Sequence, residues 1–522
     1  MNIPPKGGAA GPRSSDGDFA ADRHAPSARA ATVGRVATWA LGALVGLAAV
    51  VSGVSAAGDD KTLTVLPVAL VVALGLAWLA LTRFVAFVLL LLGARSSIDL
   101  FKLSGSAGSA SDTAAARGLD PSSILAMLFL LSSLLWLIAQ YSSGRPLKGS
   151  PVRTALLCFV AAAAISSIGS ALIAPSMLET LRILSVVMMF VILEQLITDR
   201  TRLVRTLVTT YVALAIPLLY TLGGMVLGSP ASEIKGSFTR LTGPFSQSNT
   251  FARYLAFMIV FGVALMPALN RRLQIVMGAV LSMSTIFLVL TLTRGALIAA
   301  AAGVVVLAIA QQRWRLLIAL GVAGVVAALL VPGLSDRFAT LGTEQAVGGR
   351  PTGNSLAWRL DYWTQVLPLA NSNPVTGIGL NMTQFETDAA KQPHNDFIRA
   401  YVETGLVGFG AYVSIHATLL WTTLRALRRA VPKTLEHAVA AGALGCSVCF
   451  LLGSLAANVM SNVVSLWYLV AFAAAASYVA SSAPGRAVEE APSTVTPPAA
   501  DDNQDGRGHD ELASSRPHVS SP

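Results

Sequence analysis

A polar motif at the edge of an apolar segment holds the residue best suited to proton transfer. Residues 391–410 read KQPHNDFIRAYVETGLVGFG, with His394 and Asn395 shortly before an apolar helix that we expect to begin at Glu403. An imidazole has an unperturbed pKa of about 6.5, so it can accept or donate a proton near neutral pH. We therefore expect His394 to be the residue that performs acid–base chemistry.

Three arginines lie beside apolar segments and could bind an anionic group. Arg294 stands in TLTRGAL between two apolar runs, and Arg359 stands in WRLDYW. Arg240 begins RLTGPFSQSN, which ends at Asn249. Ionisable side chains near the hydrocarbon of a membrane are costly to keep, so each is a candidate for function. A guanidinium can bind two phosphate oxygens at once, which favours a phosphate ligand.

These positions also have structural interpretations, which the sequence leaves open. Arg294 could extend its side chain to lipid phosphates. Arg359 could pair with Asp361 or Glu386, and Asn249 could cap the helix that follows it.

The sequence does not demand a metal ion or another cofactor. Cys446 and Cys449 form a C-x-x-C pair inside an apolar segment, but neither a second pair nor a nearby histidine completes a site. We expect them to pack as small apolar residues. No Asp-x-Asp pair or acidic cluster, which a divalent cation would favour, lies near the candidate residues.

Membrane helices are the elements that must position these residues. Of the 522 residues, 54% are hydrophobic and 12% are charged, against about 25% charged in a soluble domain. Apolar runs of about 20 residues recur, the length that crosses about 30 Å of hydrocarbon. The sequence therefore predicts an all-α polytopic membrane protein, a bundle of about 12 to 14 transmembrane helices.

The expected spans follow the apolar runs. They lie at residues 36–57, 62–81, 84–94, 122–140, 152–174, 180–198, 204–227, 251–269, 273–292, 295–311, 315–332, 403–424, 437–457 and 463–482. The third is short and could instead extend the second, so the count is a range. We expect residues 36–482 to form the membrane domain, with polar, disordered cytoplasmic tails at 1–35 and 483–522.

Basic loops indicate the orientation of the bundle. Clusters of Arg and Lys occur at 199–205, 270–273, 311–315 and 425–433. Loops of this kind stay in the cytoplasm, and they account for much of the net charge of +10 without nucleic-acid binding. Alternation then places residues 228–250, the link at Arg294 and a large loop at 333–401 on the opposite, external face.

The large loop contains two local patterns. WRLDYW at 358–363 predicts a short helix at the membrane surface, because Trp and Tyr favour the interface. PVTGIG at 374–379 predicts a turn, because glycine adopts backbone angles that other residues avoid.

Together these motifs resemble the O-antigen ligase and polysaccharide polymerase superfamily, bacterial enzymes that use polyprenyl-pyrophosphate-linked glycans. The resemblance covers roughly residues 200–460. It rests on RLTGPFSQSN at 240–249, TLTRGAL at 291–297, WRLDYW at 358–363, PVTGIG at 374–379 and PHNDFIRAYVETGLVG at 393–408, in this order.

The resemblance implies an integral membrane glycosyltransferase of O-antigen or exopolysaccharide synthesis in the bacterial inner membrane, with its active site on the external face. The catalytic residues would be His394, Arg294 and Arg359. Arg240, Asn249 and Asn395 would bind substrate. The partners would be a polyprenyl-pyrophosphate-linked oligosaccharide donor, a glycan or lipid-core acceptor, membrane lipids and other polysaccharide assembly proteins.

The resemblance leaves the acceptor open between polymerisation, ligation to a lipid core and transfer to a protein. An alternative function is a polytopic transporter of the cell envelope, a flippase or permease. Such proteins often show internal repeats, which this sequence lacks, and a long external loop is not what alternating access needs. A sensor or scaffold protein would not need these charged residues, so such a function does not explain them.

Overall fold

The computed structural model describes residues 61–98, 121–235, 238–331, 333–339, 346–347, 350–351 and 356–482. The predicted N-terminal tail, the first predicted span at 36–57 and the predicted C-terminal tail lie outside these residues.

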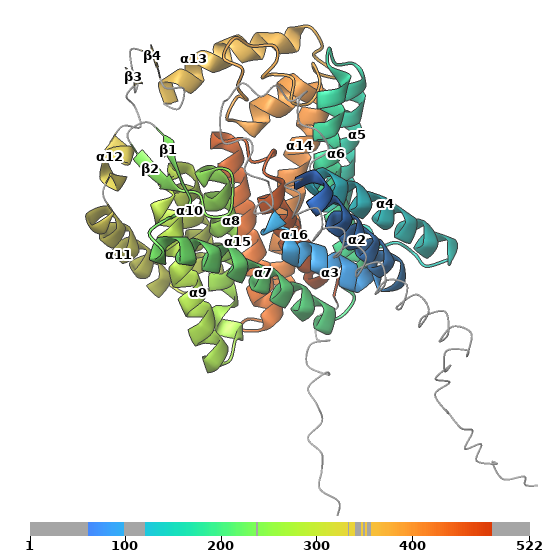
Figure 1. Cartoon of the computed structure of the whole chain (residues 1–522). Helices are drawn as coiled ribbons and strands as arrows, with labels where there is room; N and C mark the ends of the chain where they lie inside the picture. Colours follow the sequence, from blue (N-terminus) through green and yellow to red (C-terminus); the bar gives the residue numbers. More distant parts are fainter. Residues whose placement is uncertain are drawn as a thin grey trace, which may run out of the picture. The chain divides into compact units, whose positions relative to one another are not determined.

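The described chain is almost entirely helical (Figure 1). Nine of its helices are long and apolar enough to cross a membrane, and four apolar helices are shorter. The predicted all-α polytopic membrane fold is therefore confirmed. The long helices are α4 (Pro121–Ser142), α5 (Pro151–Ile168), α6 (Ile173–Leu196), α7 (Arg200–Val226), α8 (Ser248–Leu265), α9 (Arg271–Leu290), α14 (Asp396–Arg429), α15 (Leu435–Ala456) and α16 (Val463–Ser481). The shorter apolar stretches are Val71–Thr82 within α2 (Lys61–Thr82) and the helices α3 (Phe84–Ala94), α10 (Arg294–Ala310) and α11 (Arg315–Leu330).

Short elements fill the longer connections. The connection before α8 contains an antiparallel hairpin, which the sequence did not predict, of β1 (Ser232–Lys235) and β2 (Phe238–Leu241). The large loop contains α12 (Leu334–Ala339), the pair β3 (Ala346–Val347) and β4 (Arg350–Pro351), α13 (Leu356–Val366) and the 3-10 helix η4 (Leu367–Asn371). The short helix predicted over WRLDYW is α13. A further 3-10 turn, η3 (Met266–Ala268), ends α8.

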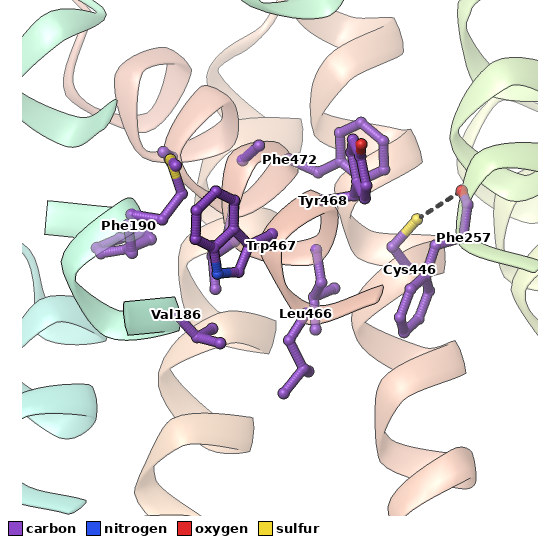
Figure 2. Packing of buried hydrophobic residues seen from close by; sticks show 14 of the residues in the cluster. Val186, Phe190, Phe257, Cys446, Leu466, Trp467, Tyr468 and Phe472 are labelled. Carbon is purple, nitrogen blue, oxygen red and sulfur yellow. Dashed lines mark hydrogen bonds between the residues drawn. The ribbon is translucent and has the colours of Figure 1, made fainter. Parts of the chain in front are cut away.

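Helix α16 lies at the centre of the packing, against α6, α8, α14 and α15. Its residues are apolar on all sides, as expected for a helix surrounded by protein. Figure 2 shows Trp467, Tyr468 and Phe472 of α16 among the buried side chains of neighbouring helices. In contrast, few residues of α4 and α9 are buried, which suits helices that face lipid.

Helices α10 and α15 approach each other closely because small residues line their contact. A Cβ atom added at Gly303 would lie 3.0 Å from the Gly445 carbonyl oxygen. Cys449 on α15 donates to the Ala299 carbonyl oxygen on α10 at 2.8 Å. Cys446, also on α15, donates to the Phe257 carbonyl oxygen on the neighbouring helix α8 at 3.4 Å (Figure 2). Small interfacial residues allow such close packing in membranes. This contact brings the start of α10 near the end of α15.

The start of helix α6 differs from the sequence prediction. Helix α6 begins at Ile173 rather than near 180, because the buried carboxylate of Glu179 has a partner in Arg399 at 3.2 Å and can lie inside the helix. Helices α2 and α3 are separate, since Arg83 between them has non-helical backbone angles. With 11 residues, α3 is about 16 Å long and too short to span a bilayer by itself.

The basic loops lie together at one end of the bundle. Arg200, at the start of α7, pairs with Glu436 at the start of α15 at 3.3 Å. Arg429, at the end of α14, donates to the carbonyl oxygen of Ala480 at the end of α16. Helices α8, α10 and α14 begin at the opposite end, and their first turns carry the candidate residues.

Candidate active site

A pocket lies where the first turns of α8 and α10 meet α13, the segment before α14 and the end of α15. It contains about 810 Å³ of empty space, counting its open mouth. Its charged and polar lining consists of Arg240, Asn249, Arg253, Thr293, Arg294, Arg359 and His394. The structure thus brings together five of the six site residues that the sequence predicts. Within the described part of the chain, no group of three or more His, Cys, Asp or Glu side chains could hold a metal ion.

Arg294 enters this pocket from the first turn of α10. The link from α9 is only three residues long, and Leu292 within it has a φ of 49°. Gly295 and Ala296 line the pocket beside Arg294. The positive end of the α10 dipole therefore faces the same space as the guanidinium, which favours an anionic ligand.

Arg240 is held in place by hydrogen bonds to the protein. Its guanidinium donates to the Thr291 carbonyl oxygen at 2.8 Å, to Thr293 Oγ1 at 2.7 Å and to Asn249 Oδ1 at 2.8 Å. The side chain comes from strand β2 and is only 2% exposed. Arg240 therefore joins the hairpin, the first turn of α8 and the α9–α10 link.

The Asn249 side chain does not cap α8. The helix begins at Ser248, and the Glu233 carboxylate from β1 accepts hydrogen bonds from the backbone N–H and hydroxyl of Ser248. Asn249 lies one residue further on, and its side-chain Oδ1 accepts hydrogen bonds from Arg240 and Thr293. Glu233 and Arg240 are register partners in the hairpin, so one two-stranded element supplies both contacts.

Arg253 is a pocket residue that the sequence analysis did not select. It follows Asn249 by four residues on α8, and residues at this spacing share one face of a helix. Its guanidinium donates to the Asn458 carbonyl oxygen at 3.1 Å. The helical spacing from Asn249 was the signal that could have identified it.

Helix α13 brings Arg359 to the pocket. Its guanidinium donates to the Ala456 carbonyl oxygen at 2.7 Å. Its Nε atom is buried and has no hydrogen-bond partner among the described residues. Burial lowers the pKa of Arg359 from its usual value, but a guanidinium titrates so far above neutral pH that it stays charged. No ion pair in the described chain joins Arg359 to Asp361 or Glu386.

The aromatic residues of α13 also fix the segment that carries His394. Trp363 Nε1 donates to the Pro393 carbonyl oxygen at 2.7 Å, and the Tyr362 hydroxyl donates to that of Lys391. The Trp358 ring lies edge-on to the imidazole, with centroids 6.4 Å apart. His394 has a φ of 54°, an uncommon conformation for a residue with a side chain. WRLDYW therefore positions both Arg359 and His394.

Asn395 has a different place from the one predicted. Its side chain caps α14 by accepting hydrogen bonds from the N–H groups of Phe397 at 2.9 Å and Ile398 at 3.2 Å. The residue is buried and lies outside the pocket lining. Asn395 thus stabilises the start of α14, the helix that follows His394.

Helix α14 begins at Asp396, seven residues before the predicted start at Glu403. The charged residues in its first turns can belong to the helix because their side chains pair with one another. Arg399 Nε lies 2.8 Å from Glu403 Oε2. Gly405 interrupts the helix with φ 66° and ψ −169°. The predicted turn at 374–379 inserts there, and the N–H of Leu406 donates to the Pro374 carbonyl oxygen at 2.9 Å.

The comparison with known families agrees with the motifs. The family model for O-antigen ligase matches residues 278–413, a segment that contains Arg294, Arg359 and His394. Arg240, Asn249 and Arg253 lie before it. No curated protein sequence matches the chain. The resemblance that the sequence predicts is therefore confirmed over this segment, which is similar to the O-antigen ligase family.

Proposed function

We propose that this protein transfers a glycan from a polyprenyl pyrophosphate to an acceptor hydroxyl, in the pocket that contains His394. The observation that carries the proposal is the meeting of one imidazole and four guanidiniums in that pocket.

The arginines would bind the pyrophosphate. Arg294 and Arg359 reach the pocket from different elements, the start of α10 and α13. Guanidiniums bind phosphate oxygens bidentately and stabilise the negative charge that develops as the glycosidic bond breaks. Arg240 and Asn249 would shape the same subsite, and Arg253 adds a further positive charge.

The remaining wall suits the lipid part of the donor. It is made of small or apolar residues from α8, α10 and α15, namely Ala256, Phe257, Ala296, Ala299, Gly453 and Ala456. A polyprenyl pyrophosphate carries an apolar chain directly on its charged group. A pocket with a cationic side and an apolar side therefore suits this amphipathic donor.

His394 would act as the general base. It would accept the proton of the acceptor hydroxyl as the oxygen attacks the anomeric carbon and the pyrophosphate leaves. The pyrophosphate is already a good leaving group, so a covalent intermediate is not needed. A single displacement inverts the configuration at the anomeric carbon.

We place this reaction at the external face of the bacterial inner membrane. The basic loops support this orientation, because such loops remain in the cytoplasm and they lie at the end of the bundle away from the pocket. The acceptor would be a second lipid-linked glycan or a lipid core, within O-antigen or exopolysaccharide synthesis.

Substitution of the three catalytic candidates tests the proposal. The variants His394→Ala, Arg294→Ala and Arg359→Ala are expressed in host cells that lack the native chain, and surface polysaccharide is resolved by gel. We expect each variant to lose on the order of 100- to 1,000-fold in rate and to deplete long polysaccharide. Accumulated single repeat units would indicate a polymerase, and accumulated full-length lipid-linked chains would indicate a ligase.

Matched controls come from the opposite end of the bundle. His437→Ala and Arg272→Ala remove the same side chains from the starts of α15 and α9, and both should leave the polysaccharide unchanged. Normal polysaccharide in the three pocket variants, at wild-type protein levels in the membrane, would refute the proposed transferase.

A further inference from the structure

Asn458 contacts His394 from the turn between α15 and α16. Its side-chain Nδ2 lies 3.3 Å from His394 Nδ1. Its Oδ1 is buried and has no hydrogen-bond partner within the described chain. Ala457 and Val459 line the pocket, whereas Asn458 is outside the lining. Asn458 therefore touches the imidazole without facing the substrate space.

The backbone of this turn is fixed independently of the Asn458 side chain. Asp396 Oδ2 accepts hydrogen bonds from the N–H groups of Val459 at 2.9 Å and Met460 at 3.0 Å. The Asn458 carbonyl oxygen accepts from Arg253 at 3.1 Å. Because Asp396 lies two residues after His394, these bonds also fix the turn relative to the imidazole.

The orientation of the Asn458 amide determines which ring nitrogen can act as a base. With Nδ2 facing the ring, Nδ1 must accept, and a neutral imidazole then carries its proton on Nε2. A half-turn of the amide presents Oδ1 instead. Nδ1 then donates to Oδ1, and Nε2 carries the lone pair. The half-turn gives the buried Oδ1 a partner and moves Nδ2 to the place without one. The proposed reaction selects the half-turn, because a base at Nε2 needs Nδ1 to carry the proton.

We propose that Asn458 is a positioning residue that holds the His394 ring and accepts a hydrogen bond from Nδ1, so that Nε2 acts as the base. This inference rests on the proposed function. During transfer, the acceptor oxygen bonds to the anomeric carbon, and the bond from that carbon to the pyrophosphate oxygen breaks with its electron pair. The hydroxyl proton passes to Nε2, and Oδ1 stabilises the resulting imidazolium through Nδ1–H.

Two substitutions separate this role from a purely structural one. Asn458→Ala removes the amide but keeps the backbone carbonyl that Arg253 contacts. Asn458→Asp is nearly isosteric and can only accept from Nδ1. The charged side chains around the ring and pocket are Arg240, Arg253, Arg294, Arg359 and the buried Asp396.

The assay uses membranes that contain the full chain. Its donor and acceptor come from a total lipid extract of host cells that lack this chain, which contains the lipid-linked oligosaccharide. We expect Asn458→Ala to lower kcat by about 10- to 100-fold, since general-base catalysis contributes about 100- to 10,000-fold in all. The KM for the lipid-linked donor should change little, because the arginines are untouched.

Asn458→Asp should recover most of the rate but change its pH dependence. A carboxylate beside the ring favours the charged imidazolium, which raises the pKa of the base. The acidic limb of the kcat profile should therefore move to higher pH. Asn371→Ala, at an exposed position at the end of η4, is the matched control and should retain the wild-type profile.

The double variant His394→Ala/Asn458→Ala distinguishes the two proposals. If Asn458 acts through His394, the second substitution should cause no further loss beyond that of His394→Ala. Wild-type kcat in Asn458→Ala, or a wild-type pH profile in Asn458→Asp, would overturn the role of Asn458 while leaving His394 in place. Full activity in His394→Ala would instead refute the proposed function itself.

Discussion

Arg399 and Glu403 form an ion pair of 2.8 Å on successive turns of α14, and both side chains are fully buried. Glu403 also accepts hydrogen bonds from the N–H groups of Asn381 at 2.6 Å and Thr383 at 3.3 Å. Arg399 reaches Glu179 on α6 at 3.2 Å. The pair therefore joins the end of the large loop to two helices, next to the segment that carries His394.

Removing one member of this pair should destabilise the protein strongly. Glu403→Ala leaves buried Arg399 with one fewer carboxylate partner and two loop N–H groups without their acceptor. We expect a loss of about 3–5 kcal/mol in the free energy of unfolding, the usual cost of breaking a buried ion pair. Thermal unfolding in detergent measures it, and Glu386→Ala, at an exposed position in the same loop, is the control. Equal unfolding temperatures would contradict the structural role of the pair.

The break in α14 predicts a second destabilising substitution. Gly405 has φ 66° and ψ −169°, angles that are essentially restricted to glycine, and an added Cβ would lie 2.2 Å from the Val375 carbonyl oxygen. Gly405→Ala should therefore cost at least about 1–3 kcal/mol and displace the 374–379 turn. Limited proteolysis of the large loop, together with thermal unfolding, measures both effects.

Gly410 is the matched control for this substitution. It lies five residues further along α14, and among the described residues no atom is within 4 Å of a Cβ added there. Gly410→Ala should be neutral or stabilise the helix by up to about 1 kcal/mol. If Gly405→Ala behaves like Gly410→Ala, the turn does not require glycine at position 405.

The sequence predicts five of the polar pocket residues, Arg240, Asn249, Arg294, Arg359 and His394, because each lies next to an apolar segment at the same end. Arg294 and Asn249 stand within the first turns of their helices, and His394 lies two residues before the start of α14. Alternation of the spans then places them at one level of the bundle. The interfacial aromatic residues of WRLDYW likewise predict α13, which carries Arg359.

The sequence alone does not predict contacts between helices that are far apart along the chain. Glu179 and Arg399 are 220 residues apart, and a carboxylate within an apolar run suggests the end of a span until its partner is known. For the same reason, the start of α14 that the sequence predicts, Glu403, is seven residues later than the observed start at Asp396. Asn458 belongs to a short turn with no polar pattern of its own, so its contact with His394 emerges only from the packing of α15 and α16.

Asn395 offers a test of the predicted substrate contact against the observed cap. If the side chain serves only to cap α14, Asn395→Asp should retain activity, since Asp caps a helix as well as Asn does. Asn395→Ala should lose about 1 kcal/mol of stability with an unchanged KM for the lipid-linked donor. A raised KM in Asn395→Asp would instead support the substrate contact that the sequence predicts.

Arg240 and Arg359 should respond differently to substitution by lysine. The Arg240 guanidinium makes three hydrogen bonds to the protein, to Thr291, Thr293 and Asn249, and an ammonium cannot reproduce that planar geometry. Arg359 bonds to a single carbonyl oxygen, and its buried Nε lacks a partner within the described residues. Arg240→Lys should therefore lower thermal stability and activity together, by about 1.5–3 kcal/mol for each charged hydrogen bond lost.

Arg359→Lys should instead lower activity while the unfolding temperature stays close to that of the wild type. A lysine keeps the positive charge but loses the bidentate contact that we propose for Arg359 with the pyrophosphate. Binding of undecaprenyl pyrophosphate in detergent micelles separates the two variants, because only Arg359→Lys should bind it more weakly without unfolding earlier. The opposite pattern, in which Arg359→Lys unfolds early and Arg240→Lys does not, would assign the structural role to Arg359.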